Sequence, residues 1–135
     1  MFAIKVEVKD LAAQTFVFRE QKTMYGGKHI ASGDVIFVFD SENEGGAGLV
    51  ACGIVTSAEA VPKRPGPERQ TPRVSIIVRR TASAHRPLGR GELKPHTHWA
   101  DGRPETEINF KLYRQATNKI VGLSTVASDF LKSFF

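Results

Sequence analysis

Residues 32–56 read SGDVIFVFDSENEGGAGLVACGIVT, two apolar segments joined by a polar, glycine-rich connection. The first segment, 35–39, is an uninterrupted run of β-branched and aromatic residues, which is typical of a strand that packs on both faces. The second segment, 49–55, is also apolar, and the connection between them contains several residues that reverse a chain. The sequence therefore predicts a β-hairpin at the centre of a mostly β (α+β) domain.

The segments around this hairpin continue the strand pattern. Residues 2–9 alternate between apolar and mostly polar side chains, so we expect a half-buried strand with Lys5 and its charged neighbours in water. Residues 73–81 and 108–113 alternate in the same way and are predicted strands. The segment 11–20 mixes a helix-start signal with strand-favouring residues and stays open between the two.

Two stretches lack a regular pattern, a basic, proline-rich loop at 62–72 and an irregular segment at 82–105. After them, Ser124 is a good N-cap for a short terminal helix, with Val126 and Leu131 on its apolar face. Several short strands, frequent turn signals and few helices predict one domain over residues 1–135. We expect a small curved sheet or β-barrel with short peripheral helices.

The charge is modestly basic overall and concentrated in one part of the chain. The net charge is +5, yet residues 61–90 alone carry eight basic residues against Glu68. Those eight are Lys63, Arg64, Arg69, Arg73, Arg79, Arg80, Arg86 and Arg90. Arginine binds phosphate through a planar fork of donors, so we expect the seven arginines to contact a nucleic-acid backbone. A solvated basic surface is the alternative.

Other classes of protein have little support in the sequence. No stretch has the length and hydropathy of a membrane span and the N-terminus lacks a signal peptide, so we expect a cytoplasmic protein with no membrane partner. The single cysteine, Cys52, lies in an apolar segment and is expected in the core. Phosphate-loop, dinucleotide and nucleophile-elbow motifs are absent, which favours a non-catalytic protein without a cofactor.

Three side chains outside the apolar runs are candidates for chemistry. His96 and His98 have a spacing that a divalent metal can use on an extended segment, and Glu92 or Asp101 would complete such a site. The alternative function is therefore a small metal-dependent enzyme that acts on a nucleotide. Trp99 lies in a polar segment, where its ring either stacks on a base or caps the barrel.

The central stretch resembles the PUA-like superfamily, and within it the EVE-domain proteins, with the ASCH group as a neighbour. The resemblance rests on KHIASGDVIFVF at 28–39, on GLVACGIVTS at 48–57, and on the segment 116–124 with the closing helix. It implies a barrel-like sheet with a pocket for a base, often a modified one, flipped out of DNA or RNA. Which nucleic acid is bound stays open.

Carried onto this sequence, the resemblance implies a set of ligand-binding residues around the central hairpin. They are Tyr25, Gly27, Lys28, His29, Ser41, Asn43 and Trp99. The early tryptophan of many EVE-like proteins is absent, so Tyr25 or Trp99 would supply the aromatic wall. We therefore expect a nucleic-acid-binding module, with a protein-interaction domain that uses the proline-rich segment as a further alternative.

Overall fold

The computed structural model describes residues 1–66, 69–115 and 118–135, and in it six strands close into a barrel in the order β1-β3-β4-β5-β2-β6. The strands are β1 (Phe2–Val6), β2 (Thr15–Met24), β3 (Val35–Asp40), β4 (Gly48–Ala60), β5 (Arg73–Ser83) and β6 (Lys119–Gly122). Pro67 of the predicted loop and residues 116–117 of the terminal motif lie outside the described residues. The predicted β-barrel with peripheral helices is confirmed.

The predicted central hairpin is confirmed as β3 and β4, which pair antiparallel from Val35 opposite Ile54 to Asp40 opposite Gly48. β1 runs parallel along the other edge of β3, so β3 lies inside the sheet. Its apolar run is continuous because both faces are covered, as the sequence predicts for a strand without alternation.

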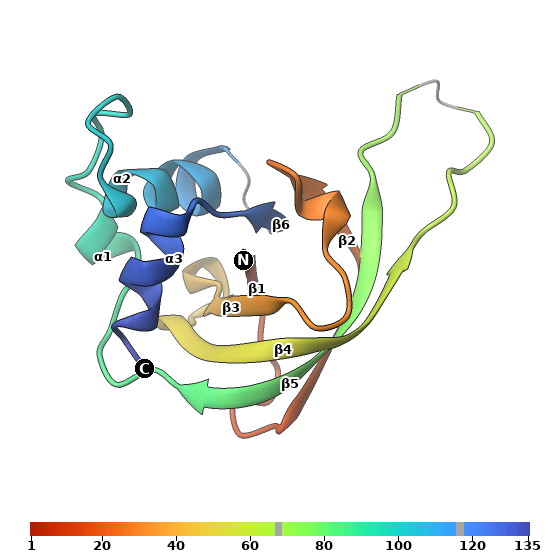
Figure 1. The fold of residues 1–135 in the computed structure, drawn as a ribbon, viewed down its shortest axis with the longest axis horizontal. Coiled ribbons are helices and arrows are strands. Elements are labelled where there is room, and N and C mark those ends of the chain that lie inside the picture. The colour runs from red at the N-terminus through yellow and green to blue at the C-terminus, as the bar shows by residue number, and fades with distance from the viewer. Residues whose placement is uncertain (67–68, 116–117) are drawn as a thin grey trace.

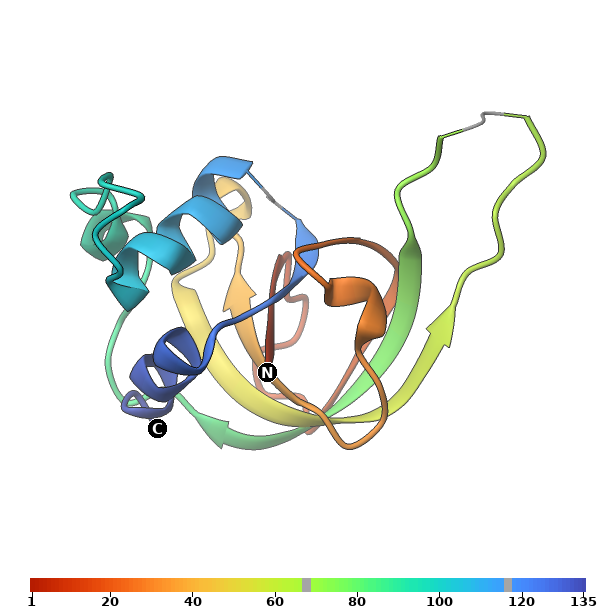
Figure 2. The ribbon, with the colours of Figure 1, turned by 45° about the horizontal axis from the view of Figure 1, so that its top comes forward.

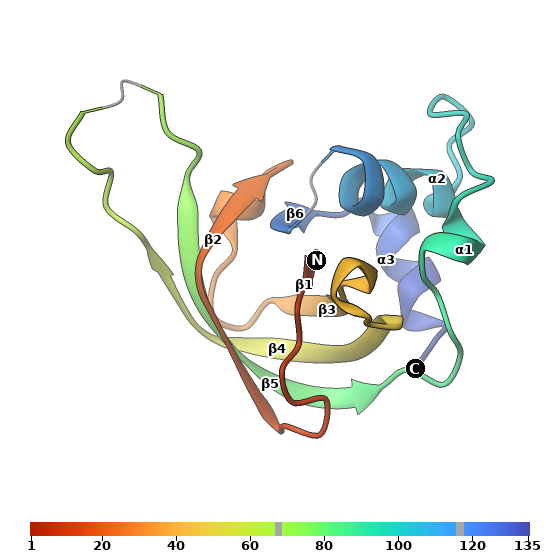
Figure 3. The ribbon, with the colours of Figure 1, turned by 180° about the vertical axis from the view of Figure 1, so that it is seen from behind.

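Helices gather on one side of the barrel (Figures 1, 2 and 3). They are α1 (Arg90–Leu93), α2 (Pro104–Ile108), which continues into a π-helix (Asn109–Gln115), and α3 (Thr125–Lys132). Two short 3-10 turns, η1 (Gly27–His29) and η2 (Glu42–Glu44), complete the list. No helix in these ranges is long and apolar enough to cross a bilayer.

The helices create a second core outside the barrel. Ile36 and Val38 point into the barrel, where they pack with residues such as Ile76. Phe37 and Phe39 point outward and pack against Leu112 and other helical residues. Because β3 serves both cores, this strand joins the helical layer to the barrel.

The prediction of a strand at 108–113 is wrong, since these residues belong to α2 and the π-helix. Pro104 occupies the first turn, where its missing N–H costs no hydrogen bond. Ile108 and Leu112, four residues apart, both face the core and are buried, which is the helical spacing. The segment predicted as irregular, 82–105, likewise contains the end of β5, all of α1 and the start of α2.

Lys5 is also placed differently from the prediction, because its side chain is fully buried. The alternating pattern of 2–9 assigned it to water, which would hold for a strand with one solvated face. Here the outer face of β1 and β3 is covered by helical residues, with the Lys5 Nζ 4.4 Å from the centroid of the Tyr113 ring. The helical layer therefore buries a charge that the strand pattern left exposed.

The remaining expectations have mixed outcomes. Segment 11–20 resolves in favour of a strand, because β2 begins at Thr15. Cys52 is half-buried against the helix-side core, and burial raises the pKa of its thiol. The terminal helix α3 is confirmed with its Ser124 cap, yet Val126 is exposed instead of packed. β4 ends at Ala60 and β5 begins at Arg73, so the predicted loop separates two strands.

Candidate functional site

A groove of about 690 Å³ opens between the helical layer and the end of β2. We call it the aromatic groove. The residues that line it are Tyr25, Trp99, Gly102, Arg103, Thr106, Glu107, Phe110, Lys111, Gln115, Ser124 and Val126. Three aromatic rings with a few converging polar groups are typical of a small-molecule or base site. The π-helix supplies Phe110, Lys111 and Gln115, and such helices occur often at functional sites.

Tyr25 follows directly after β2 and is held in an unfavourable backbone conformation. Its φ is +53°, in the left-handed region that an aromatic residue adopts only where its surroundings impose it. Its carbonyl accepts a hydrogen bond of 3.1 Å from the N–H of Gly122. A Cβ at residue 122 would lie 2.3 Å from that carbonyl oxygen, so this close approach requires glycine.

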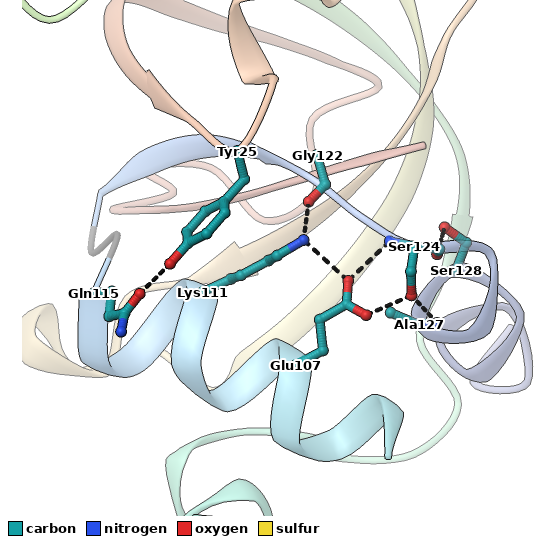
Figure 4. Close-up of polar contacts among 8 residues, drawn as sticks. All are labelled: Tyr25, Glu107, Lys111, Gln115, Gly122, Ser124, Ala127 and Ser128. Carbon is teal, nitrogen blue, oxygen red and sulfur yellow. Dashed lines mark hydrogen bonds and ion pairs between the residues drawn. The ribbon is translucent and has the colours of Figure 1, made fainter. Parts of the chain in front are cut away.

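The Tyr25 side chain extends over the π-helix (Figure 4). Its hydroxyl donates to Oε1 of Gln115, and the Lys111 Nζ lies 4.9 Å from the ring centroid. Tyr25 is 42% exposed, so the residue keeps a free surface despite these contacts. Its position is therefore fixed by the helix while the ring remains available to a ligand.

Lys111 and Glu107, which both line the groove, form an ion pair (Figure 4). The Lys111 Nζ donates to Oε2 of Glu107 at 3.1 Å and to the carbonyl of Gly122 at 2.7 Å. Glu107 also accepts from the backbone N–H of Ser124 at 2.8 Å and from the Ser124 hydroxyl. Burial favours the neutral acid, but the Ser124 hydrogen bonds and the Lys111 charge outweigh it and lower the pKa of Glu107.

Trp99 forms another wall of the groove from the loop between α1 and α2. Trp99 is 79% exposed, which is unusual for a tryptophan. Asp101 stabilises this loop by accepting from the Arg103 N–H at 2.9 Å and from the Thr106 hydroxyl at 3.0 Å. Those two hydrogen bonds lower the pKa of the Asp101 carboxyl. The loop is thus tied to the start of α2 beside the groove.

The structure divides the predicted ligand residues. Tyr25 and Trp99 both line the aromatic groove, whereas Lys28 and His29 are exposed in η1 outside its lining. Gly27 serves packing, because a Cβ there would lie 2.1 Å from the carbonyl oxygen of Ile120. The role of these five residues in binding a ligand stays a prediction.

Ser41 and Asn43 belong to a different cluster, beside α1. Ser41 is buried, and its N–H donates to the carbonyl of Val6 at 2.9 Å. The Asn43 Oδ1 accepts from the Arg90 guanidinium at 2.9 Å. Between them, Glu42 accepts from the Arg90 N–H at 2.7 Å and from the Tyr113 hydroxyl at 2.6 Å. The Arg90 guanidinium thus already binds the side-chain oxygen of Asn43, and the role of Ser41 and Asn43 in binding a base stays a prediction.

The predicted phosphate-binding arginines are dispersed, and most of them contact the protein itself. Arg80 donates to the carbonyls of Leu11 and Ala12 at 2.8 and 3.0 Å. Arg86 donates to Ser133 and lies over the Phe134 ring, 4.1 Å from its centroid. Arg64, Arg69 and Arg73 lie on or beside the loop at 61–72, which projects away from the helices (Figures 1 and 2).

The described ranges contain no complete metal site around His96 and His98. In 1–66, 69–115 and 118–135, no group of three or more His, Cys, Asp or Glu lies close enough together to hold a metal ion. The backbone of His96 does have a role, since its carbonyl accepts from the Asn109 side chain at 2.9 Å. Both His96 and His98 lie in the loop between α1 and α2.

The sequence analysis did not identify Phe110, Lys111 and Glu107, which line the aromatic groove. All three belong to the helical segment, two of them in the stretch predicted as a strand. The pairing of Glu107 with Lys111, four residues apart, was the available signal, because that spacing stabilises helices.

Similarity to known proteins is limited to three-dimensional structure. No protein-family model matches the sequence, and no curated protein does so either. The DUF55 domain of human thymocyte nuclear protein 1 superposes with a TM-score of 0.66 at 19% identity, over 98% of this chain and 96% of that one.

Two further solved structures agree with this likeness. Human THYN1 protein in complex with 5-methylcytosine-containing DNA gives a TM-score of 0.67 at 20% identity, over 98% of this chain and 95% of that one. A protein from Pseudomonas putida gives 0.62 at 13% identity, over 98% and 97%. These likenesses, at 13–20% identity, show the fold alone, and they confirm the PUA-like fold that the sequence predicted for this chain.

Proposed function

We propose that this protein is a non-catalytic nucleic-acid-binding module that holds one base in the aromatic groove. The observation that carries the proposal is that Tyr25 and Trp99, far apart in sequence, line one cavity of about 690 Å³. A structural neighbour with this fold is bound to DNA that contains 5-methylcytosine, which supports the same ligand class for this chain. The net charge of +5 favours an anionic partner.

The groove has the groups that recognition of a base requires. Rings of Tyr25, Trp99 and Phe110 offer flat apolar surfaces, and base–aromatic stacking contributes about 1–3 kcal/mol per base. Gln115 and Lys111 offer hydrogen-bond donors at the groove wall for the polar edge of the base. An apolar lining also suits a base that carries a methyl group.

The dispersed arginines have a secondary part in this proposal. Arg64, Arg69 and Arg73 near the projecting loop, and Arg79 on β5, add long-range attraction for phosphates without reading sequence. Arg80, Arg86 and Arg90 retain spare donors beyond the internal hydrogen bonds described above. Binding therefore weakens as salt increases.

The test compares oligonucleotides that differ in one nucleotide. Fluorescence anisotropy measures the affinity of the purified protein for labelled DNA and RNA strands that contain cytosine, 5-methylcytosine or an abasic site at one position. We expect the abasic strand to bind at least fivefold more weakly, because it lacks the stacked base. Tyr25→Ala should produce a similar loss.

Tyr25→Phe is the matched control for this test. It keeps the ring and removes only the hydroxyl bonded to Gln115, so we expect an affinity within about threefold of the wild type. Equal affinity for the abasic and base-containing strands, together with no effect of Tyr25→Ala, would overturn the proposal.

A further inference from the structure

A second cavity, of about 380 Å³, lies between α1 and the π-helix. We call it the cationic pocket. Its lining consists of Arg90, Lys94, Thr97, Asn109, Tyr113 and Arg114. Three of these side chains are cations and none is acidic. A pocket with this composition is complementary to a compact anion with several acceptor oxygens.

Two carboxylates, Glu42 and Glu92, lie near this pocket without lining it, and both accept hydrogen bonds. Glu42 accepts from the Arg90 backbone N–H and from the Tyr113 hydroxyl, and Glu92 accepts from the Gly89 N–H at 2.8 Å. The ion pairs found among the described residues involve neither Arg90, Lys94 nor Arg114. The three cations of the pocket therefore outnumber the two nearby carboxylates, and none of the three is in an ion pair within the described ranges.

Lys5 adds a further positive charge behind the pocket wall. Its side chain is fully buried, and its Nζ makes no hydrogen bond within the described part of the chain. Its Nζ lies over the ring of Tyr113, a residue that also lines the pocket. Burial, and next the charge of Arg90, lower the pKa of Lys5, while Glu42 opposes the shift. A bound anion would relieve this excess of positive charge.

The cationic pocket adjoins the aromatic groove in two places. The Arg114 guanidinium lies 5.0 Å from the centroid of Phe110, which lines the groove. Thr97 lines the pocket and Trp99 lines the groove, so one short loop borders both. A nucleotide with its base in the groove would thus have a neighbouring phosphate within reach of the pocket.

We infer that the cationic pocket binds a phosphate group, and specifically the phosphodiester next to the nucleotide held in the aromatic groove. The second clause rests on the proposed function, whereas phosphate binding itself does not. Arg114 and Lys94 supply charge-assisted donors from the open side, and Arg90, oriented by Asn43, supplies donors from α1. A terminal or free phosphate has the same chemistry, so the test separates these sources.

The first arm of the test uses inorganic phosphate alone. In two-dimensional NMR spectra of ¹⁵N-labelled protein, we expect saturable shifts of the backbone amides of Lys94, Thr97 and Arg114 on titration with phosphate. Arg114→Gln should weaken these shifts several-fold. Lys9→Gln removes one equal charge from the exposed connection between β1 and β2, and it should leave the shifts unchanged.

The second arm uses a 5-methylcytosine strand in which one phosphodiester beside that base is replaced by a neutral methylphosphonate. We expect this strand to bind the wild type about tenfold more weakly. Arg114→Gln should bind the unmodified strand about tenfold more weakly and be insensitive to the replacement, because the two changes remove the same contact. A 5′-terminal phosphate on a strand without this base should depend on Arg114 less than the internal phosphodiester does, because no stacked base positions it.

The outcomes of the two proposals are separable. If the abasic strand binds as well as the intact one but keeps its dependence on Arg114, the phosphate site stands and the base site fails. If the affinity depends on the base yet Arg114→Gln and Lys94→Gln behave like Lys9→Gln, the phosphate inference is overturned. Dependence on Arg114 only with a terminal or free phosphate would overturn the assignment to the phosphodiester.

Discussion

The helical segment from α2 through the π-helix has different charge arrangements on its two sides. On the side of the aromatic groove, Lys111 is neutralised by Glu107 and fixed to the carbonyl of Gly122. On the side of the cationic pocket, the side chains of Arg90, Lys94 and Arg114 form no ion pair in the described ranges. A charge in an ion pair holds its neighbours in a fixed geometry, whereas a charge without an ion pair remains able to attract a ligand of opposite charge. The same helical segment therefore fixes the geometry of the aromatic groove and supplies positive charge to the cationic pocket.

Among the substitutions that test this difference between the two sides, Glu107→Ala should have the largest effect on stability. It leaves Lys111 and the Ser124 N–H without their acceptor in a partly buried place, so we expect a loss of about 2 kcal/mol in the free energy of unfolding. Urea denaturation measures this loss. A change below about 0.5 kcal/mol would show that the pair does not order the groove.

The Glu107 contribution should also depend on pH. Because the folded protein lowers the pKa of Glu107 below the usual 4.5, its stabilising effect is complete above that value. It is lost as the pH falls through the lowered folded pKa. The difference in unfolding free energy between the wild type and Glu107→Gln should therefore shrink on acidification, and a constant difference would contradict the paired arrangement.

Trp99→Ala should separate binding from stability. Trp99 is 79% exposed, so removal of its ring should change the unfolding free energy by less than about 0.5 kcal/mol. Loss of stacking should nevertheless weaken binding of a 5-methylcytosine strand about tenfold in the anisotropy assay. A large loss of stability with unchanged affinity would make Trp99 a structural cap instead.

Lys5→Met tests the charge behind the cationic pocket. Replacing an unpaired buried ammonium by an apolar side chain of similar length should raise the free energy of unfolding by about 1 kcal/mol near neutral pH. Thermal and urea unfolding measure it. A variant less stable than the wild type would show that the cation–π contact with Tyr113 outweighs the cost of burial.

The gain from Lys5→Met should diminish in alkaline solution. The folded pKa of Lys5 lies below 10.5, so between the two values the unfolded chain binds a proton that the folded chain does not. Stability of the wild type therefore rises with pH in that window relative to the variant. A gain that grows with pH would contradict a buried, destabilising charge.

Arg64→Gln should have the smallest effect. Its ion pair with Glu20, at 3.8 Å, is exposed and contributes little. We expect stability within about 0.5 kcal/mol of the wild type and an affinity for DNA reduced about twofold, well below the loss for Arg114→Gln. An effect on affinity as large as that of Arg114→Gln would place the main phosphate contact on the loop at 61–72.

The sequence predicted the barrel from local signals that tertiary packing reinforced. The hairpin of β3 and β4 combined strand propensity with turn residues, and both point to the same structure. Tyr25 and Trp99 stood out because they are aromatic residues outside apolar runs. Their ligand role stays a prediction, although the fold places both in one groove.

Other features depended on contacts that alternation cannot reveal. Six residues at 108–113 fit a strand or a helix, and only burial of Ile108 with Leu112 against β3 selects the helix. Because the segment is helical, Phe110 and Lys111 line the aromatic groove. The arginines dispersed because a strand sends successive side chains to opposite sides, and because the loop carries several of them away from the helices.

Intrinsic fluorescence gives the most direct measurement of the central claim, because Trp99 is the only tryptophan in the chain. Titration with a strand that contains 5-methylcytosine should change the Trp99 emission saturably, at the same concentrations at which anisotropy reports binding. The abasic strand should leave the emission unchanged. If the intact strand binds with no change in Trp99 emission, the base does not occupy the aromatic groove and the account is contradicted.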